Sequence, residues 1–143
     1  MADWWQWSPK KEEEALTFAV VGVGRFGTAV CRELISNGVD VLAADSSEKA
    51  IDDLRQLEPT IEARVIDCTD EESMKESGIL EMNTVVVGIS EPIEASITTT
   101  LIAKDSEGTK VKRVIARATS DLHEKMLKPV SYTHLTLPTN KAV

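Results

Sequence analysis

Three glycines, Gly22, Gly24 and Gly27, have the spacing G-x-G-x-x-G and directly follow a short apolar run that is rich in β-branched residues. In this spacing the first glycine permits a tight turn, the second lets a pyrophosphate approach bare backbone, and the third lets a helix pack against a strand. The unpaired N–H groups and the dipole at the start of that helix favour a negative charge. The motif therefore predicts a phosphate-binding loop.

A carboxylate follows at the distance that nucleotide binding requires. Asp45 ends a second apolar run, residues 39–44, roughly 20 residues past the glycines, where an acid would hold ribose hydroxyls. Such an acid speaks against NADP, because it would repel the phosphate on the ribose. Alternatively, Asp45 caps the next helix, since two serines and Glu48 come directly after it.

A second acidic position, Asp67, ends the third apolar run and is followed by Cys68, Thr69 and Asp70. Asp67 would either face the bound base or ribose at the carboxyl edge of a sheet, or merely brace the turn. Thr69 or Asp70 is a suitable N-cap for a short helix that runs through Met74.

These residues lie on a regular alternation of strands and helices. Strands are expected directly before Gly22 and at residues 39–44, 62–67, 83–89 and 113–118, and helices at residues 27–37, 47–57, 69–77, 92–104 and 120–127. This alternation predicts an α/β fold: a Rossmann-like, doubly wound and mostly parallel sheet of about five strands, truncated at its C-terminal end. Its ligand crevice is expected at the carboxyl ends of the first and fourth strands. The apolar stripe Ile93, Ile97 and Leu101 fits either the core or a dimer interface.

Composition limits the possible functions. The chain has 143 residues, enough for about one domain, and its 42% hydrophobic and 28% charged residues are ordinary for a soluble globular protein. A net charge of −8 argues against non-specific nucleic-acid binding. Cys31 and Cys68 are too few for a disulfide framework or a metal site, and we expect reduced thiols. No apolar stretch approaches the ~20 residues that a membrane span needs.

The two ends of the chain differ from its middle. Residues 1–15 contain all three tryptophans, Trp4, Trp5 and Trp7, and are interpreted as a flexible leader whose rings pack loosely on the domain. An aromatic anchor for a partner or a membrane is the alternative, which nearby acids disfavour. Residues 129–143 lack a helical period and resemble translated vector tails, so we interpret them as a non-native scar. The nucleotide-binding domain is thus expected to span residues 16–128.

Catalytic groups are not evident. The sequence has no nucleophile paired with a base, no Tyr-x-x-x-Lys arrangement and no metal-ligand cluster, which favours a binding module over an enzyme. His123, beside Glu124, is expected to be a solvated side chain on a surface helix turn, and His134 lies in the predicted scar.

Residues 16–128 resemble the nucleotide-binding half of the RCK/KTN domain, also called TrkA-N. The resemblance rests on the glycine motif with Arg25 and Phe26 inside it, on Asp45, and on residues 67–70, 93–97, 114–118 and 123–127. It implies a cytoplasmic regulatory subunit of a Trk or Ktr bacterial potassium uptake system. Such subunits assemble as rings of dimers on a membrane channel or transporter at the inner membrane, and bound ATP, ADP or NAD(H) gates ion transport.

The resemblance also implies a set of nucleotide-binding residues. The glycines would line the phosphates, Asp45 would hold the ribose, and Asp67 with Cys68 would meet the adenine. Arg25 would contact a terminal phosphate, in its own or a neighbouring subunit, unless it is a solvated loop side chain. The complete predicted site consists of Gly22, Gly24, Arg25, Phe26, Gly27, Asp45, Ser46, Asp67, Cys68, Thr69, Ile89 and Arg117.

Two other functions fit the same residues. The chain could be the NAD-binding half of a truncated dehydrogenase, because the glycine motif and Asp45 suit that class equally well. It could also be an interaction fragment with a vestigial pocket. A regulator would bind both ATP and ADP without hydride transfer, whereas a dehydrogenase half would strongly prefer NAD over ATP. A vestigial site would bind none of these nucleotides.

Overall fold

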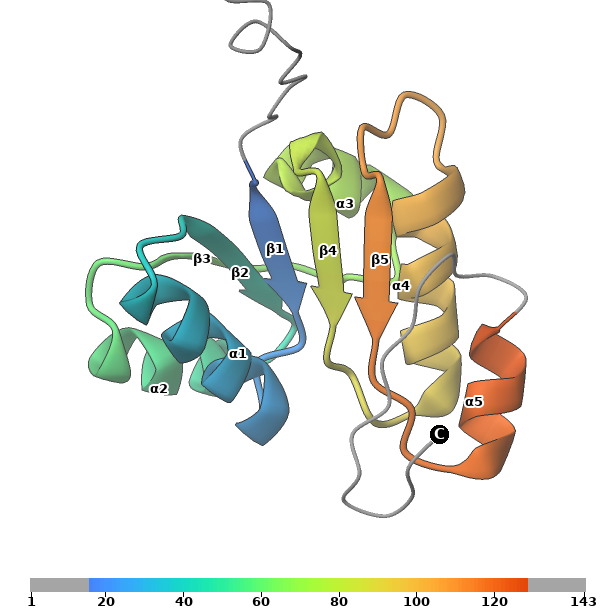
Figure 1. Ribbon diagram of the computed structural model, residues 1–143, viewed down its shortest axis with the longest axis horizontal. Helices are drawn as coiled ribbons and strands as arrows, with labels where there is room; N and C mark the ends of the chain where they lie inside the picture. The colour runs from blue at the N-terminus through green and yellow to red at the C-terminus, as the bar shows by residue number, and fades with distance from the viewer. Residues whose placement is uncertain (1–15, 129–143) are drawn as a thin grey trace, which may run out of the picture.

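Five parallel strands form one sheet in the order β3-β2-β1-β4-β5 (Figure 1). The computed structural model describes residues 16–128, so the predicted leader and the predicted scar lie outside the described residues. The strands are β1 (Phe18–Val21), β2 (Val41–Asp45), β3 (Glu62–Val65), β4 (Thr84–Val87) and β5 (Arg113–Ala116). The predicted Rossmann-like α/β fold with about five parallel strands is confirmed.

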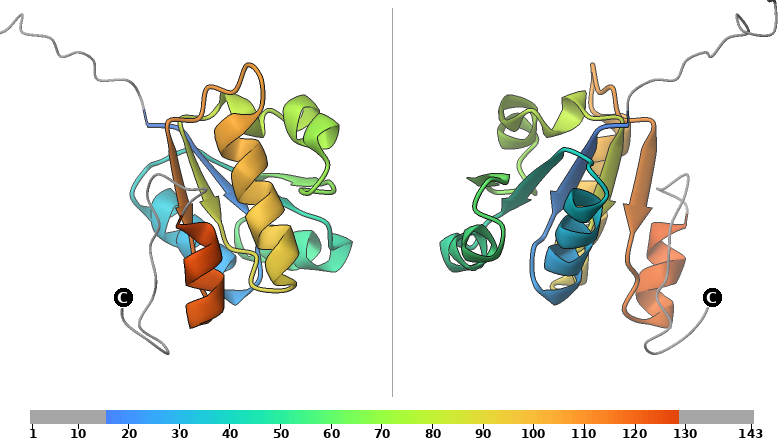
Figure 2. Two further views of the ribbon diagram at one scale, coloured as in Figure 1. Left: turned by 90° about the vertical axis from the view of Figure 1, so that its right-hand side faces the viewer. Right: turned by 60° about the vertical axis from the view of Figure 1, so that its left-hand side comes forward.

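Helices cover both faces of this sheet. On one face lie α1 (Arg25–Ser36) and α2 (Glu48–Leu57); on the other lie α3 (Glu71–Ser77), the 3₁₀ turn η1 (Ile79–Glu81), α4 (Ile93–Asp105) and α5 (Asp121–Leu127). Figure 2 shows α4 and α5 side by side on their face of the sheet. Alternate strand residues divide between the two layers: Val20 packs with the α1 and α2 layer, whereas Val21 packs with the opposite one. Both faces of the central strands are therefore buried, as a parallel sheet requires.

Side-chain caps determine where three of the helices begin. Ser47 Oγ accepts the Ala50 N–H at 3.1 Å before α2, and Asp70 Oδ2 accepts the Ser73 N–H at 3.0 Å before α3. Ser120 Oγ accepts the His123 N–H at 3.1 Å before α5. Each bond satisfies one of the free N–H groups of a first helical turn. The N-cap of α2 is thus Ser47 and not Asp45.

The expectation that His123 is solvated is wrong. Its side chain is fully buried, and its Nε2 lies 2.9 Å from Ser96 Oγ on α4. Its Nδ1 accepts the Thr119 N–H at 3.2 Å. The ring is buried because α5 lies against α4, a contact between segments that are distant in sequence.

The apolar stripe on α4 is only partly in the core. Leu101 is exposed, whereas Ile97 is half-buried and packs against the main core cluster. The fully buried positions of α4 include Ser96, Thr99 and Thr100. Thr99 donates its hydroxyl to Cys68 O at 3.0 Å and Thr100 donates to Ser96 O at 2.8 Å, so these buried polar groups are satisfied. Among residues 16–128, none of the helices is long and apolar enough to cross a bilayer.

Candidate nucleotide-binding site

A cavity of about 270 Å³ opens at the carboxyl edge of the sheet, where the strand order reverses between β1 and β4. This is the position at which open α/β sheets bind their ligands. Of the predicted site residues, the cavity is lined by Gly22, Gly24, Asp45, Ser46, Asp67, Cys68, Thr69 and Ile89. The structure thus gathers residues from four separate loops around one space, while their contact with a nucleotide stays a prediction.

The three glycines occupy different environments. Gly22 has φ +94°, and a Cβ there would lie 2.8 Å from the backbone nitrogen of Ile89. A Cβ on Gly27 would overlap the carbonyl oxygen of Gly22. Gly24, in contrast, has a negative φ, and a Cβ there would meet no atom within 4 Å, although the residue lines the cavity. Turn geometry and packing therefore account for Gly22 and Gly27, but the bare backbone at Gly24 faces open space that a ligand could fill.

Helix α1 begins at this open position. Its N-cap is Gly24, which supplies no side-chain hydrogen bond, and its first turn carries no acidic residue. The first helical hydrogen bond of the turn runs from Thr28 N–H to Gly24 O at 2.9 Å. The positive end of the helix dipole is therefore left to solvent or to an anion at the cavity rim.

The Asp45 carboxylate joins the glycine loop to the start of α2. Its Oδ2 accepts the Val23 N–H at 2.8 Å, and its Oδ1 accepts the Ser47 N–H at 2.8 Å. A carboxylate has about four acceptor positions, so both oxygens retain capacity for ribose hydroxyls. Asp45 thus holds the phosphate loop in place and remains available at the cavity wall.

Asp67 braces its own turn. It accepts the Thr69 hydroxyl at 2.6 Å and the Thr69 N–H at 3.0 Å. These bonds lower the pKa of the Asp67 carboxyl, with the hydroxyl bond having the larger effect. Asp67 is therefore ionised at neutral pH, and it presents a second carboxylate to the cavity alongside Asp45.

Cys68 is a buried thiol in the cavity wall. Burial raises its pKa to about 12, and the negative charges of Asp45 and Asp67 contribute to the rise. At neutral pH it is therefore a protonated thiol and not a thiolate nucleophile. Cys68 and Cys31 are both free cysteines. Among residues 16–128 there is no group of three His, Cys, Asp or Glu side chains arranged to hold a metal.

Four predicted site residues do not line the cavity: Arg25, Phe26, Gly27 and Arg117. The Arg117 guanidinium carbon lies 5.1 Å from the centre of the Phe26 ring, a cation–π contact between the loop after β5 and the first turn of α1. Arg25, which directly precedes Phe26 in the sequence, has an exposed side chain. The structure therefore brings cationic side chains to the α1 end of the site.

Of the residues in the loop that follows β4, the predicted site contained only Ile89. Gly88, Ser90, Glu91, Pro92 and Ala95 also line the cavity. A Cβ on Gly88 would lie 2.8 Å from Gly22 O, which keeps this loop close to the glycine motif. The available signal was its position, because a loop that follows a buried central strand at the switch point must border the crevice.

The strand order and the helices on both faces define a Rossmann-type domain, with the cavity at its topological switch point. More specifically, the chain belongs to the TrkA-N domain family, whose model matches residues 18–138. It is similar to Ktr system potassium uptake protein C of Bacillus subtilis, with 37% identity over 121 residues that make up 85% of this chain and 52% of the relative. It is also similar to Ktr system potassium uptake protein A of Vibrio alginolyticus, with 36% identity over 85% of this chain and 53% of the relative. The chain spans about half the length of these relatives.

Solved structures share the fold. The TrkA-N domain of inner membrane protein ybaL from Escherichia coli aligns with a TM-score of 0.71 and 18% identity, covering 87% of this chain and 89% of that domain. The GsuK channel bound to NAD aligns with a TM-score of 0.70 and 11% identity, covering 92% of this chain and 25% of that one. GsuK bound to ADP aligns with a TM-score of 0.67 and 12% identity over 94% and 37% of the two chains. Proteins that contain a domain of this fold thus occur in structures with NAD or ADP.

Proposed function

We propose that this chain is the nucleotide-binding part of a regulatory subunit of a potassium uptake system, and that it binds an adenine nucleotide, NAD(H) or ATP/ADP, to gate ion transport. The observation that carries the proposal is the open glycine loop. Gly24 exposes bare backbone to the cavity at an uncapped helix start, while Asp45 holds the loop and faces the same space. The Ktr relatives supply the transport context.

Each part of the cavity has a separate role in this proposal. The phosphates would lie on Gly22 and Gly24 at the start of α1, where backbone N–H groups and the helix dipole favour anions. The ribose would meet Asp45, and the adenine would lie toward Asp67 and Cys68. No group in the described cavity is arranged as a nucleophile with its base, so the proposed role is regulatory and not catalytic.

The partners follow from the same relationship. We propose that the subunit forms homodimers that assemble into a ring on a membrane channel or transporter subunit. It would lie in the cytoplasm, associated with the inner membrane through that partner. A change in the bound nucleotide would alter the ring and thereby the transport of potassium.

Calorimetric titration of the purified chain with ATP, ADP, NAD, NADH and NADP tests the proposal. We expect binding of ATP and ADP with comparable affinities, weak binding of NADP, and no hydride transfer. A strong preference for NAD or NADH with ATP ignored would favour either a regulator that responds to the redox state of NAD or the alternative, the cofactor half of a dehydrogenase. Binding of none of the five would contradict nucleotide regulation by this cavity.

A further inference from the structure

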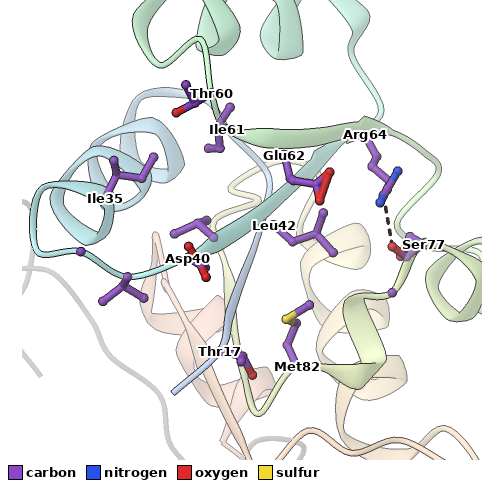
Figure 3. A pocket seen from close by; sticks show the side chains of 14 residues that line it. Thr17, Ile35, Asp40, Leu42, Thr60, Ile61, Glu62, Arg64, Ser77 and Met82 are labelled. Carbon is purple, nitrogen blue, oxygen red and sulfur yellow. Dashed lines mark hydrogen bonds between the residues drawn. The ribbon is translucent and has the colours of Figure 1, made fainter. Parts of the chain in front are cut away.

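A second and larger hollow lies at the opposite edge of the sheet, near the amino ends of β1, β2 and β3. Its volume is about 570 Å³, and it shares no lining residue with the nucleotide cavity. Figure 3 shows side chains converging on this space from Thr17 just before β1, from β2 and β3, and from the segment after α3, among them Leu42, Glu62 and Met82. We call it the amino-edge groove.

The groove combines an apolar wall with charged side chains. Its apolar lining consists of Ile35, Val39, Val41, Leu42, Ile61 and Met82. Asp40 and Glu62 contribute exposed carboxylates, and Arg64 contributes a guanidinium whose Nε donates to Ser77 O at 3.2 Å. This lining suits an occupant with large apolar or aromatic groups and a nearby positive charge.

The chain itself contains a segment of that chemistry. Trp4, Trp5 and Trp7 are its only tryptophans, and Lys10 and Lys11 follow them closely. We propose that residues 4–11 dock in the amino-edge groove, with tryptophan rings against the apolar wall and the lysines facing Asp40 and Glu62. The proposal concerns a different surface from the nucleotide cavity and does not depend on nucleotide binding.

The point of attachment supports an intramolecular occupant. Thr17 lines the groove and follows Trp7 by ten positions and Lys11 by six. An extended chain covers about 3.3 Å per residue, so the tether allows Trp7 to reach up to ~33 Å, and Trp4 up to ~43 Å, from Thr17. A short tether of this kind gives an effective concentration of about millimolar, which favours the chain's own segment over a free competitor.

Charges along the segment match those of the groove. The lysine pair meets the carboxylates of Asp40 and Glu62, and Arg64 supplies a positive charge for the acidic run at residues 12–14, between the lysines and Thr17. Arg64 can also lie over a tryptophan face, because guanidinium groups are favourable cation–π partners of indole rings. The same acidic run disfavours an anionic membrane as the occupant.

Tryptophan fluorescence of the full chain tests the proposal directly, because every tryptophan lies in the proposed segment. We expect emission that is blue-shifted relative to the same chain in denaturant, with low accessibility to acrylamide. The double substitution Asp40→Lys/Glu62→Lys should shift the emission to the red and raise quenching. The control Asp105→Lys/Glu107→Lys changes net charge equally at exposed positions outside the groove and should leave the emission unchanged.

Swapping the charges of the lysine pair and of the groove carboxylates controls for indirect effects of the substitutions on folding. Lys10→Glu/Lys11→Glu alone should also expose the tryptophans, and its combination with Asp40→Lys/Glu62→Lys should restore the blue-shifted emission, which a merely unfolded variant could not do. Solvent-exposed emission in the unaltered chain would overturn the proposal. A blue shift of the tryptophan emission that grows with protein concentration would also overturn it, because it would indicate that a second copy of the chain provides the binding surface. So would a blue shift that requires vesicles of anionic lipid.

Discussion

Asp45 shows how one side chain combines structural and binding roles. Its two oxygens accept one backbone N–H each, from the glycine loop and from the start of α2. The sequence suggested a choice between ribose binding and helix capping, but Ser47 performs the capping and leaves Asp45 at the cavity wall. A residue that holds the loop can therefore also define the ribose end of the site.

Replacing Asp45 by Asn should affect both roles. An amide has only one acceptor oxygen, so one of the two backbone N–H groups loses its partner, at a cost of about 1–3 kcal/mol in the free energy of unfolding. The Asn side chain would no longer repel the ribose phosphate of NADP. The ratio of the affinity for NAD to that for NADP should therefore fall about tenfold, which is about 1.4 kcal/mol in binding free energy. Urea unfolding and calorimetry measure these changes. Asp53→Asn, at an exposed ion pair with Lys49, should change stability by less than about 0.5 kcal/mol; an equal loss there would contradict this role of Asp45.

The two glycines that differ most in surroundings should respond differently to alanine. Gly24→Ala meets no atom within 4 Å and keeps a negative φ, so the free energy of unfolding should change by less than about 1 kcal/mol while nucleotide affinity falls more than tenfold. Gly27→Ala should destabilise the fold by about 3 kcal/mol or more, because its Cβ would overlap Gly22 O. Urea unfolding and calorimetry on both variants check the contrast. Unchanged binding by Gly24→Ala would argue against phosphate contact at this loop.

At the scale of elements, α5 is attached to the sheet layer through α4. His123 Nδ1 accepts a backbone N–H, so the neutral ring carries its proton on Nε2 and donates it toward Ser96 Oγ. Ala95, next to Ser96, lines the nucleotide cavity. The packing of α5 is thus one residue away from the cavity wall.

Burial lowers the pKa of His123, and this makes the attachment of α5 sensitive to acid. A lowered folded pKa means that the unfolded chain binds the proton first, so stability is complete above the ordinary value of 6.5 and declines as the pH falls below it. Up to about 1.4 kcal/mol is lost per pH unit over the shifted range. Denaturant unfolding at pH 7.5 and 5.5 should show a smaller pH effect in His123→Gln than in the unaltered chain.

Ser96→Ala is the matched comparison on α4. It removes the acceptor of the Nε2 proton and should lower stability at pH 7.5 by about 1–3 kcal/mol, but it retains the titrating ring and hence the pH effect. If His123→Gln kept the full pH effect, the acid sensitivity would have to come from another group.

For the molecule as a whole, the reactivity of the two cysteines measures how well the helices on each face of the sheet exclude solvent. Cys31 is buried on the α1 face and Cys68 on the opposite one. Burial raises the pKa of each thiol from 9.0 to about 12, with Glu58 adding to the effect at Cys31. Folding therefore keeps both thiols protonated over the physiological pH range.

This protection should disappear with unfolding and with alkali. At pH 8, a thiol-disulfide reagent should react only slowly with the native chain. In denaturant, the same reagent should react rapidly with both cysteines. Because the folded pKa values are raised, the thiol contribution to stability is complete below pH 9 and is lost as the pH rises toward 12, by about 1.4 kcal/mol per thiol and pH unit. Cys31→Ala/Cys68→Ala should flatten that alkaline decline in denaturant unfolding. Rapid labelling of the native chain would show that the layers open readily.

Local signals in the chain were sufficient for the order of the strands and α-helices, although not for the 3₁₀ turn η1. Apolar runs of β-branched residues, glycine and serine boundaries and the 3.6-residue period act between near neighbours, so they could be read without coordinates. The same is true of the glycine motif and Asp45, whose spacing follows from one strand–helix–strand unit. These features also carried the resemblance to the TrkA-N family, which the comparison confirms.

Contacts between distant segments were beyond that reading. His123 is buried because α5 packs on α4. The crevice between the first and fourth strands was expected, but not that Glu91 and Ala95 also border it. The amino-edge groove likewise joins Thr17, Glu62 and Met82 from three separate segments. Burial depends on which helices meet across a face of the sheet, and cavities depend on which loops meet at its edges. Sequence periodicity describes one element at a time, so these properties emerge only when the layers are assembled.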